Sequence, residues 1–128
     1  MQSECIKNWH EVVNQRDPGL LNGLLADDVV FHSPVVHTPQ KGKTITTMYL
    51  TAAMDVLFGD SWQYVSEMYN DHRATLEFET VIDGITINGV DLIQWNTEQK
   101  IVEFKVMVRP LKAIGLLHQM MAEKLKAT

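Results

Sequence analysis

An aspartate within an apolar segment is the residue of this chain best suited to chemistry. Asp91 lies in the segment Gly89-Val90-Asp91-Leu92-Ile93-Gln94-Trp95. Burying an unpaired carboxylate there costs several kcal/mol, so the side chain needs a partner or must take up a proton. A protonated carboxyl group can donate a hydrogen bond to a carbonyl or epoxide oxygen. We therefore predict a catalytic role for Asp91. The alternatives are a structural ion pair with Arg109 or Lys105 and a hydrogen-bonded carboxylate with no chemistry.

Histidines could move protons, because imidazole changes charge near neutral pH. His37 lies in the segment 32–39, where two prolines prevent regular structure. His32 precedes Ser33, and neighbouring strand residues point to opposite faces, so His32 should point away from a pocket that Ser33 lines. We predict His37 as the proton-transferring residue, and the alternative is an ordinary loop histidine.

The first helix is predicted from Ser3, because a serine side chain can accept a hydrogen bond from the first helical turn. Ile6, Trp9 and Val13 recur at a spacing that places them on one buried stripe. We therefore expect Trp9 to face inward, either as core packing or as part of a pocket wall.

A second short helix is expected after Asp17, with Pro18 at its first position. Leucines would form its apolar side: Leu20, Leu21, Leu24 and Leu25. Residues 26–28 would end this helix, and residues 29–31 would form a brief strand. A third helix is expected between Gly42 and Gly59. It contains Tyr49, whose hydroxyl could reach Asp91 or a ligand.

The second half of the chain predicts four strands and a terminal helix. Segments 62–70, 73–81, 85–96 and 100–109 are rich in β-branched and aromatic residues, and short turns separate them. Such short links indicate an antiparallel meander. After Pro110, the helix seam would consist of Leu111, Ile114, Leu117, Met121 and Leu125. Helices followed by a sheet that must be covered on one face predict an α+β fold.

Alternation along two strands predicts an aspartate in an apolar wall that faces the interior. On one strand, Asp91 shares a face with Ile87, Gly89, Ile93 and Trp95. On the next strand, the apolar face consists of Val102, Phe104, Val106 and Val108. We assign both faces to the interior, with Trp95, Phe104 and Val106 as candidate ligand contacts beside Asp91.

Composition narrows the range of functions. The 128 residues are expected to form one domain, 1–128. A net charge of -5 with scattered Lys and Arg argues against nucleic-acid binding. Cys5 has no cysteine partner in the chain, and no segment has the length and apolar character of a signal sequence or membrane span. Dispersed histidines and the lack of a glycine-rich phosphate loop predict no metal and no organic cofactor. We expect a cytoplasmic protein that binds neither nucleic acid nor membranes.

Several short motifs, in this order, carry a family resemblance: Trp9, Ala26-Asp27-Asp28-Val29-Val30-Phe31-His32-Ser33-Pro34, Gly42 and Gly89-Val90-Asp91. With the order of elements, they resemble the nuclear transport factor 2-like superfamily, most closely its SnoaL-like and ketosteroid-isomerase-like branch. The resemblance covers nearly the whole chain. It implies a curved antiparallel sheet that N-terminal helices wrap into a cone, a C-terminal helix, one apolar pocket and commonly a homodimer. Some relatives are isomerases, polyketide cyclases or epoxide hydrolases.

The resemblance also assigns individual positions. Ser33 stands where ketosteroid isomerases have their proton-shuttling aspartate, and a serine hydroxyl cannot act as that base without a neighbouring base. Trp9 falls on the family's hydrogen-bonding tyrosine, and Asp91 falls on its protonated aspartate. The architecture places the loop of His37 near the pocket mouth, which makes His37 the substitute base. One of the three catalytic positions is kept.

Three functional hypotheses follow. The first is an isomerase, cyclase or hydrolase in which Asp91 is a neutral acid and His37 moves a proton, with Trp9, Ser33 and Tyr49 near the substrate. The second is a binding protein with the same pocket and a small apolar ligand but no chemistry. The third is an interaction module that uses the outer sheet and the terminal helix. Surplus apolar residues there favour a homodimer, although a thick core would also explain them: Met107, Leu116, Met120 and Met121.

Overall fold

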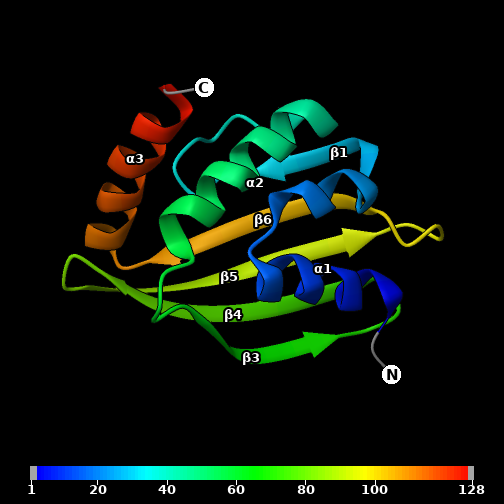
Figure 1. Cartoon of the computed structure of the whole chain (residues 1–128), viewed down its shortest axis with the longest axis horizontal. Coiled ribbons are helices and arrows are strands. Elements are labelled where there is room, and N and C mark those ends of the chain that lie inside the picture. Colours follow the sequence, from blue (N-terminus) through cyan, green and yellow to red (C-terminus); the bar gives the residue numbers. More distant parts are fainter. Residues whose placement is uncertain (1–2, 127–128) are drawn as a thin grey trace.

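Helices lie on one face of a curved, open sheet of six strands in the computed structural model, which describes residues 3–126 (Figure 1). The helices are α1 (Glu4–Gln15), the 3-10 helix η1 (Pro18–Gly23), α2 (Lys43–Leu57) and α3 (Leu111–Lys126). The strands are β1 (Leu25–His32), β2 (Gln40–Lys41), β3 (Gln63–Tyr69), β4 (Arg73–Ile82), β5 (Ile85–Trp95) and β6 (Ile101–Arg109). The predicted α+β class is therefore confirmed. No helix within residues 3–126 combines the length and the apolar character that a membrane span requires.

The sheet has the strand order β2-β1-β6-β5-β4-β3. Strands β3 to β6 form the predicted antiparallel meander. The prediction of a four-strand sheet was wrong, because β1 pairs in parallel with β6 and β2 pairs with the edge of β1. These two pairings join segments far apart in the sequence, so local patterns did not reveal them.

The second predicted helix is shorter than expected. Asp17 caps it, accepting a hydrogen bond from the Gly19 amide at 2.9 Å, but the helix is a 3-10 helix that ends at Gly23. Leu25 already belongs to β1 and pairs with Ile101 of β6, so pairing with the sheet overrides the helical leucine spacing. Leu20, predicted to be on the apolar side, is 39% exposed.

Helix α1 matches its prediction. The Ser3 hydroxyl oxygen accepts a hydrogen bond from the Ile6 amide at 3.3 Å, which satisfies one of the free amides of the first turn. Trp9 is buried with the rest of the inner stripe: Cys5, Ile6, Val12 and Val13.

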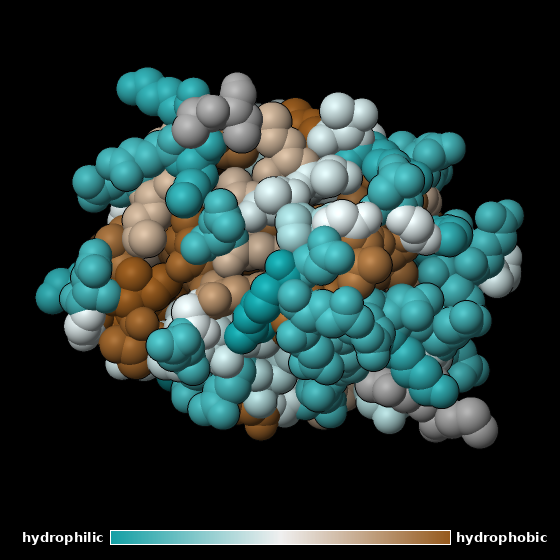
Figure 2. Space-filling view, viewed as in Figure 1, coloured by the Kyte–Doolittle hydropathy of each residue, from teal (hydrophilic) through white to brown (hydrophobic). Residues whose placement is uncertain are grey.

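Helix α3 has a different buried face from the one predicted. Its buried residues are Ala113, Leu117 and Met121, whereas Leu111 is 83% exposed. Leu111 is the first residue of the helix, directly after Pro110, and its side chain lies on the outer side. Figure 2 shows exposed apolar residues, in brown, at the left end of the molecule, near the start of α3.

The interior face of the sheet follows the predicted alternation with one shift. Strand β5 buries its alternate residues, including Asp91 and Trp95. On β6, a register shift after Gln94 places Ile101 opposite Trp95, so Ile101 is fully buried. The assignment of Val102 to the interior face was wrong, and this residue is only half-buried.

Candidate functional site

An apolar cavity of about 50 Å³ lies between the sheet and the helices. Aromatic side chains make up much of its wall: Trp9, Phe31, Phe58, Trp62, Phe78 and Phe104. Aliphatic residues of α2 and α3, such as Leu50 and Leu117, complete the wall. The polar side chains other than indoles are Ser33 and Asp91, and Asp91 is only 6% exposed. The cavity therefore presents one carboxyl group to a largely hydrocarbon interior.

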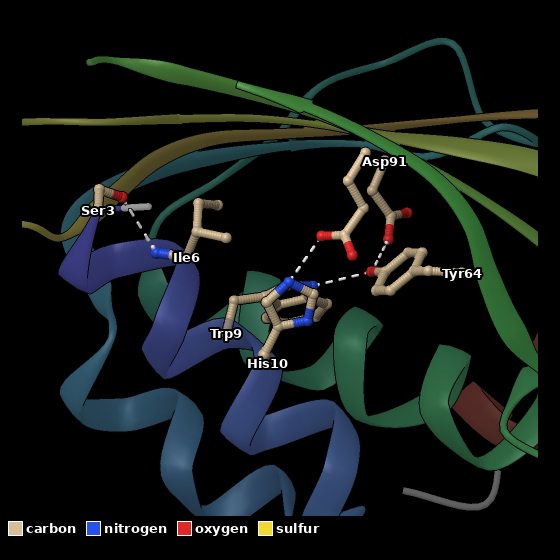
Figure 3. A network of polar contacts seen from close by, with 7 residues as sticks. Ser3, Ile6, Trp9, His10, Tyr64 and Asp91 are labelled. Carbon is tan, nitrogen blue, oxygen red and sulfur yellow. Dashed lines mark hydrogen bonds and ion pairs between the residues drawn. The ribbon is translucent and has the colours of Figure 1, made fainter. Parts of the chain in front are cut away.

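A short chain of hydrogen bonds holds this carboxyl group (Figure 3). The Tyr64 hydroxyl donates to Oδ2 of Asp91 at 2.5 Å, and the Trp9 indole N–H donates to the Tyr64 oxygen at 2.8 Å. Within residues 3–126, no donor bonds the other carboxyl oxygen, Oδ1. Asp91 can therefore offer this atom to a ligand without losing its bond to Tyr64.

Burial decides the ionisation of this pair. Removal from water raises the pKa of Asp91 to about 7, and the hydrogen bond from Tyr64 opposes part of that rise. Burial, and then the charge and hydrogen bond of Asp91, raise the pKa of Tyr64 well above its ordinary value. Tyr64 therefore remains a neutral donor, while Asp91 changes protonation near neutral pH.

A second contact ties α1 to β3 beside this chain. His10 lies 2.7 Å from Glu67, and its ring meets that of Tyr64 edge-to-face at 5.9 Å (Figure 3). Both groups are partly exposed, so the pair contributes little to stability. It is a local contact between α1 and β3 next to Tyr64.

The structure brings five predicted site residues together. Asp91, Trp9, Ser33, Phe104 and Val106 all line the cavity. Ser33 satisfies a backbone group, since its hydroxyl oxygen accepts from the Val35 amide at 3.1 Å. His32 points elsewhere, as alternation predicted, and lies 3.1 Å from Glu103.

His37 does not line the cavity that holds Asp91. It lines a neighbouring depression with His32 and Lys105, which shares Ser33 and Val106 with the cavity wall. The reason is the pairing of β2 with β1, which turns the loop back along the edge of the sheet. His37 therefore lacks the placement beside Asp91 that its predicted role requires.

Tyr49 and Trp95 also lie outside the cavity wall. The Tyr49 ring packs against Phe31 at 5.7 Å, and the hydroxyl that reaches Asp91 belongs to Tyr64 instead. Trp95 is buried four residues further along β5 than Asp91, which corresponds to roughly 13 Å along an extended strand. It faces the core but is too distant to share the site.

Tyr64 and Trp62 are the site residues with a polar group that sequence reasoning missed. They are two residues apart, so alternation places them on one face, and a buried tyrosine or tryptophan usually needs a polar partner. That signal was present in the segment 62–70. Its link to Asp91 depends on the register that pairs Tyr64 with Phe78 and Phe78 with Gly89.

No other ligand set is apparent. Within residues 3–126, no group of three His, Cys, Asp or Glu side chains could hold a metal ion. Cys5 is buried, and burial raises the pKa of its thiol to about 12. Its thiol is therefore unreactive near neutral pH.

Comparison with known proteins places this chain in a family. No protein-family model and no curated protein matches the chain. Among solved structures, a steroid delta-isomerase from Pseudomonas aeruginosa is 30% identical, with a TM-score of 0.90, over 96% of this chain and 90% of that chain. A Silicibacter pomeroyi protein with a cystatin-like fold is also 30% identical, with a TM-score of 0.86, over 94% of this chain and 84% of that one.

The chain belongs to the nuclear transport factor 2-like superfamily. A similar fold is seen in a protein from Catenulispora acidiphila with a ketosteroid isomerase-like fold, in complex with trimethylamine. That protein is 14% identical, with a TM-score of 0.63, over 89% of this chain and 91% of that chain. At this identity the likeness extends to the fold alone. Membership in the superfamily supports a small-molecule-binding fold for this protein.

Proposed function

We propose that this protein acts on a small, largely apolar carbonyl or epoxide compound as a cofactor-independent isomerase, cyclase or hydrolase, with Asp91 as a neutral acid. One observation carries the proposal. Asp91 is buried in an apolar cavity wall, with Oδ2 bonded to Tyr64 and Oδ1 without a donor among residues 3–126. A neutral carboxyl group so placed can donate to one ligand oxygen.

Ligand binding favours the protonated form of Asp91. The pKa of this carboxyl group is already about 7 because of burial. An apolar ligand would displace water from the cavity and remove solvation that stabilises the charged form. The pKa would therefore rise further in the complex, so Asp91 would hold its proton at neutral pH.

The hydrogen-bond chain strengthens this donor. Trp9 donates to Tyr64, and Tyr64 donates to Asp91, so each bond polarises the next. With an epoxide, the proton of Asp91 would pass to the ring oxygen as a C–O bond breaks. Water would form the new C–O bond and return a proton to Asp91. With a carbonyl compound, the same donor would polarise the C=O bond.

The volume of the cavity indicates a smaller substrate than a steroid. A cavity of about 50 Å³ is well below the roughly 150 Å³ that accommodates benzene in an engineered protein core. Ser33 also occupies the position expected for the steroid-isomerising base. The complex of the Catenulispora protein with trimethylamine supports a ligand of a few atoms for a protein of this fold. We therefore expect a substrate much smaller than a steroid, and side chains of the cavity wall would move apart to admit one as large as benzene.

Non-catalytic binding is the second candidate. Its support is that Asp91 is the one titratable side chain in the described wall of the cavity. An enolisation or cyclisation would need a base, and His37 lies in the neighbouring depression. A carrier or sensor needs only one orienting hydrogen bond.

The substitution Asp91→Asn separates the two candidates. Asparagine keeps the shape and can still exchange hydrogen bonds, but it cannot transfer a proton. Small methyl ketones and small epoxides would be screened for thermal stabilisation and for turnover by NMR. An enzyme should lose about a hundredfold or more of its rate in Asp91→Asn. A binder should show no turnover in either form and only a change in affinity.

The control for this experiment is Asp71→Asn, which alters an exposed turn outside the cavity. It should leave both binding and rate unchanged. If no ketone or epoxide stabilises the wild-type protein, the proposed ligand class is wrong.

A further inference from the structure

Trp62 lines the cavity and carries a buried polar group. Its side chain is 7% exposed and lines the cavity, and its indole N–H has no hydrogen-bond acceptor among residues 3–126. Burying a donor without an acceptor lowers stability, so native proteins rarely do it without a reason. A group supplied from outside the chain would satisfy this donor.

The other two tryptophans show why Trp62 is distinctive. The indole N–H of Trp9 is used, since it donates to Tyr64 at 2.8 Å. The indole N–H of Trp95 also has no acceptor among the described residues, but Trp95 does not line the cavity. A ligand that fills the cavity can therefore contact Trp62 and cannot reach Trp95.

We infer that Trp62 donates a second hydrogen bond to the ligand, and that the ligand class is a small apolar molecule with two oxygen acceptors, such as a keto ether, a keto ester or a diketone. This inference rests on the proposed function, because it requires the same cavity and the same first contact with Asp91. An indole N–H can only donate, so the second ligand group must be an acceptor. A monofunctional ketone would leave the N–H of Trp62 unpaired.

Aromatic neighbours hold the Trp62 side chain in place. Its ring lies 4.4 Å from that of Phe58, 4.5 Å from that of Tyr64 and 5.9 Å from that of Phe78. A donor fixed by such packing loses little freedom when it binds, which favours affinity. The contact with Tyr64 is edge-to-face, at 70°. The ring face of Tyr64 is therefore the competing acceptor that an experiment must distinguish.

Pairs of isosteric probes test the inference. Methoxyacetone replaces one methylene of methyl propyl ketone by an ether oxygen, so it adds an acceptor with almost no change in shape. Methoxyethyl methyl ketone and methyl butyl ketone form a second pair with one more methylene between the oxygens. At least one keto ether should bind about three- to tenfold more tightly than its ketone, as expected for one neutral hydrogen bond.

The readout is proton–nitrogen NMR of the three indole N–H groups, assigned with single Trp→Phe variants. The keto ether should shift the Trp62 resonance downfield, and the ketone should not. The Trp95 resonance is an internal control for a buried N–H outside the cavity, and the Trp9 resonance is a control for an N–H already bonded. Trp62→Phe should abolish the preference for the keto ether over its matched ketone, whatever change the smaller ring makes to the affinity for both.

Equal affinity within both pairs, with no downfield shift at Trp62, would overturn the inference. The proposed function would survive that result, because the ketones would still bind through Asp91. Failure of all four probes to bind would overturn both. The NMR measurement uses the wild-type protein, so it decides the matter even if Trp62→Phe does not fold.

Discussion

The hydroxyl of Tyr64 on β3 donates to Asp91 on β5 across the intervening strand β4, over a distance of 2.5 Å. Tyr64 keeps its proton because its pKa is raised well above the ordinary value, and Asp91 changes protonation at about pH 7. The carboxyl group is therefore neutral or charged according to conditions close to neutrality, while its hydrogen bond persists. Two of the following predictions concern this pair.

Asp91 should make the protein less stable as the pH rises from about 4 to about 7. Between pH 3.8 and about 7, Asp91 of the folded protein holds a proton that the unfolded chain has already lost. The contribution of this proton to the free energy of unfolding is therefore complete below pH 3.8 and is lost as the pH rises to about 7. The rise in pKa from 3.8 to about 7 corresponds to on the order of 4 kcal/mol. Denaturant unfolding across this range should show the loss in the wild type and a flatter profile in Asp91→Asn. Parallel profiles would contradict this prediction.

Tyr64→Phe should raise the pKa of Asp91 above about 7, because the hydrogen bond from Tyr64 lowers it. The substitution also leaves the Trp9 N–H without its acceptor, so we expect a loss of about 1–3 kcal/mol in the free energy of unfolding. Infrared titration of the carboxyl band, identified by its absence in Asp91→Asn, would measure the pKa. Tyr69→Phe, on the same strand and 43% exposed, is the control and should change neither quantity.

Gly89→Ala should destabilise the protein by about 1–3 kcal/mol through overpacking. A methyl group at this position would lie 2.3 Å from Cζ of Phe78 and 2.9 Å from the Met107 carbonyl oxygen. Phe78 lines the cavity, so its displacement should also alter ligand affinity. Thermal unfolding with and without ligand would measure both effects, and Phe78→Leu should restore part of the stability of Gly89→Ala.

Gly115→Ala offers a control of opposite sign. Nothing lies within 4 Å of the added methyl group, and Gly115 is inside α3. Alanine should therefore stabilise the protein by about 0.5–1 kcal/mol, because it loses less chain entropy in a helix. Destabilisation by both alanines would show that the close contact at Gly89 is not the cause.

Ser3→Ala should cost about 1 kcal/mol, because it removes the side-chain acceptor for the Ile6 amide. Helix α1 carries Trp9, so loosening its first turn should also weaken the support of Tyr64. Chemical unfolding would measure the loss. Ser3→Asp keeps an acceptor at this position and should retain wild-type stability, so an equal loss in both variants would argue against the cap.

We expect the protein to form a homodimer through the outer face of the sheet. A groove there includes Met68 and Met107, which are 68% and 50% exposed. Apolar exposure of this kind is typical of interfaces. Sedimentation equilibrium should give a dimer for the wild type and a monomer for Met107→Glu. A monomeric wild type at micromolar concentration would refute this prediction.

Much of the architecture followed from the sequence, because helices and hairpins leave local traces. The cap at Ser3, the inward stripe with Trp9 and the alternation around Asp91 were all confirmed. Asp91 stood out because burying a carboxylate among apolar strand residues costs free energy unless the group has a hydrogen-bond partner or takes up a proton. The residues at positions 25–28 were misassigned because leucine spacing fits a helix, and only pairing with β6 makes them a strand.

The composition of the site was decided by the tertiary structure. The sequence by itself identified Asp91 and Trp9 from patterns in their own segments, and it identified Ser33 through the family resemblance. Strand register brought Tyr64 to Asp91, the pairing of β2 with β1 kept His37 in the neighbouring depression, and the packing of Trp62 left its N–H without an acceptor. The physical reason is that alternation fixes which face a side chain takes, whereas contacts between strands depend on a register that a single segment does not encode.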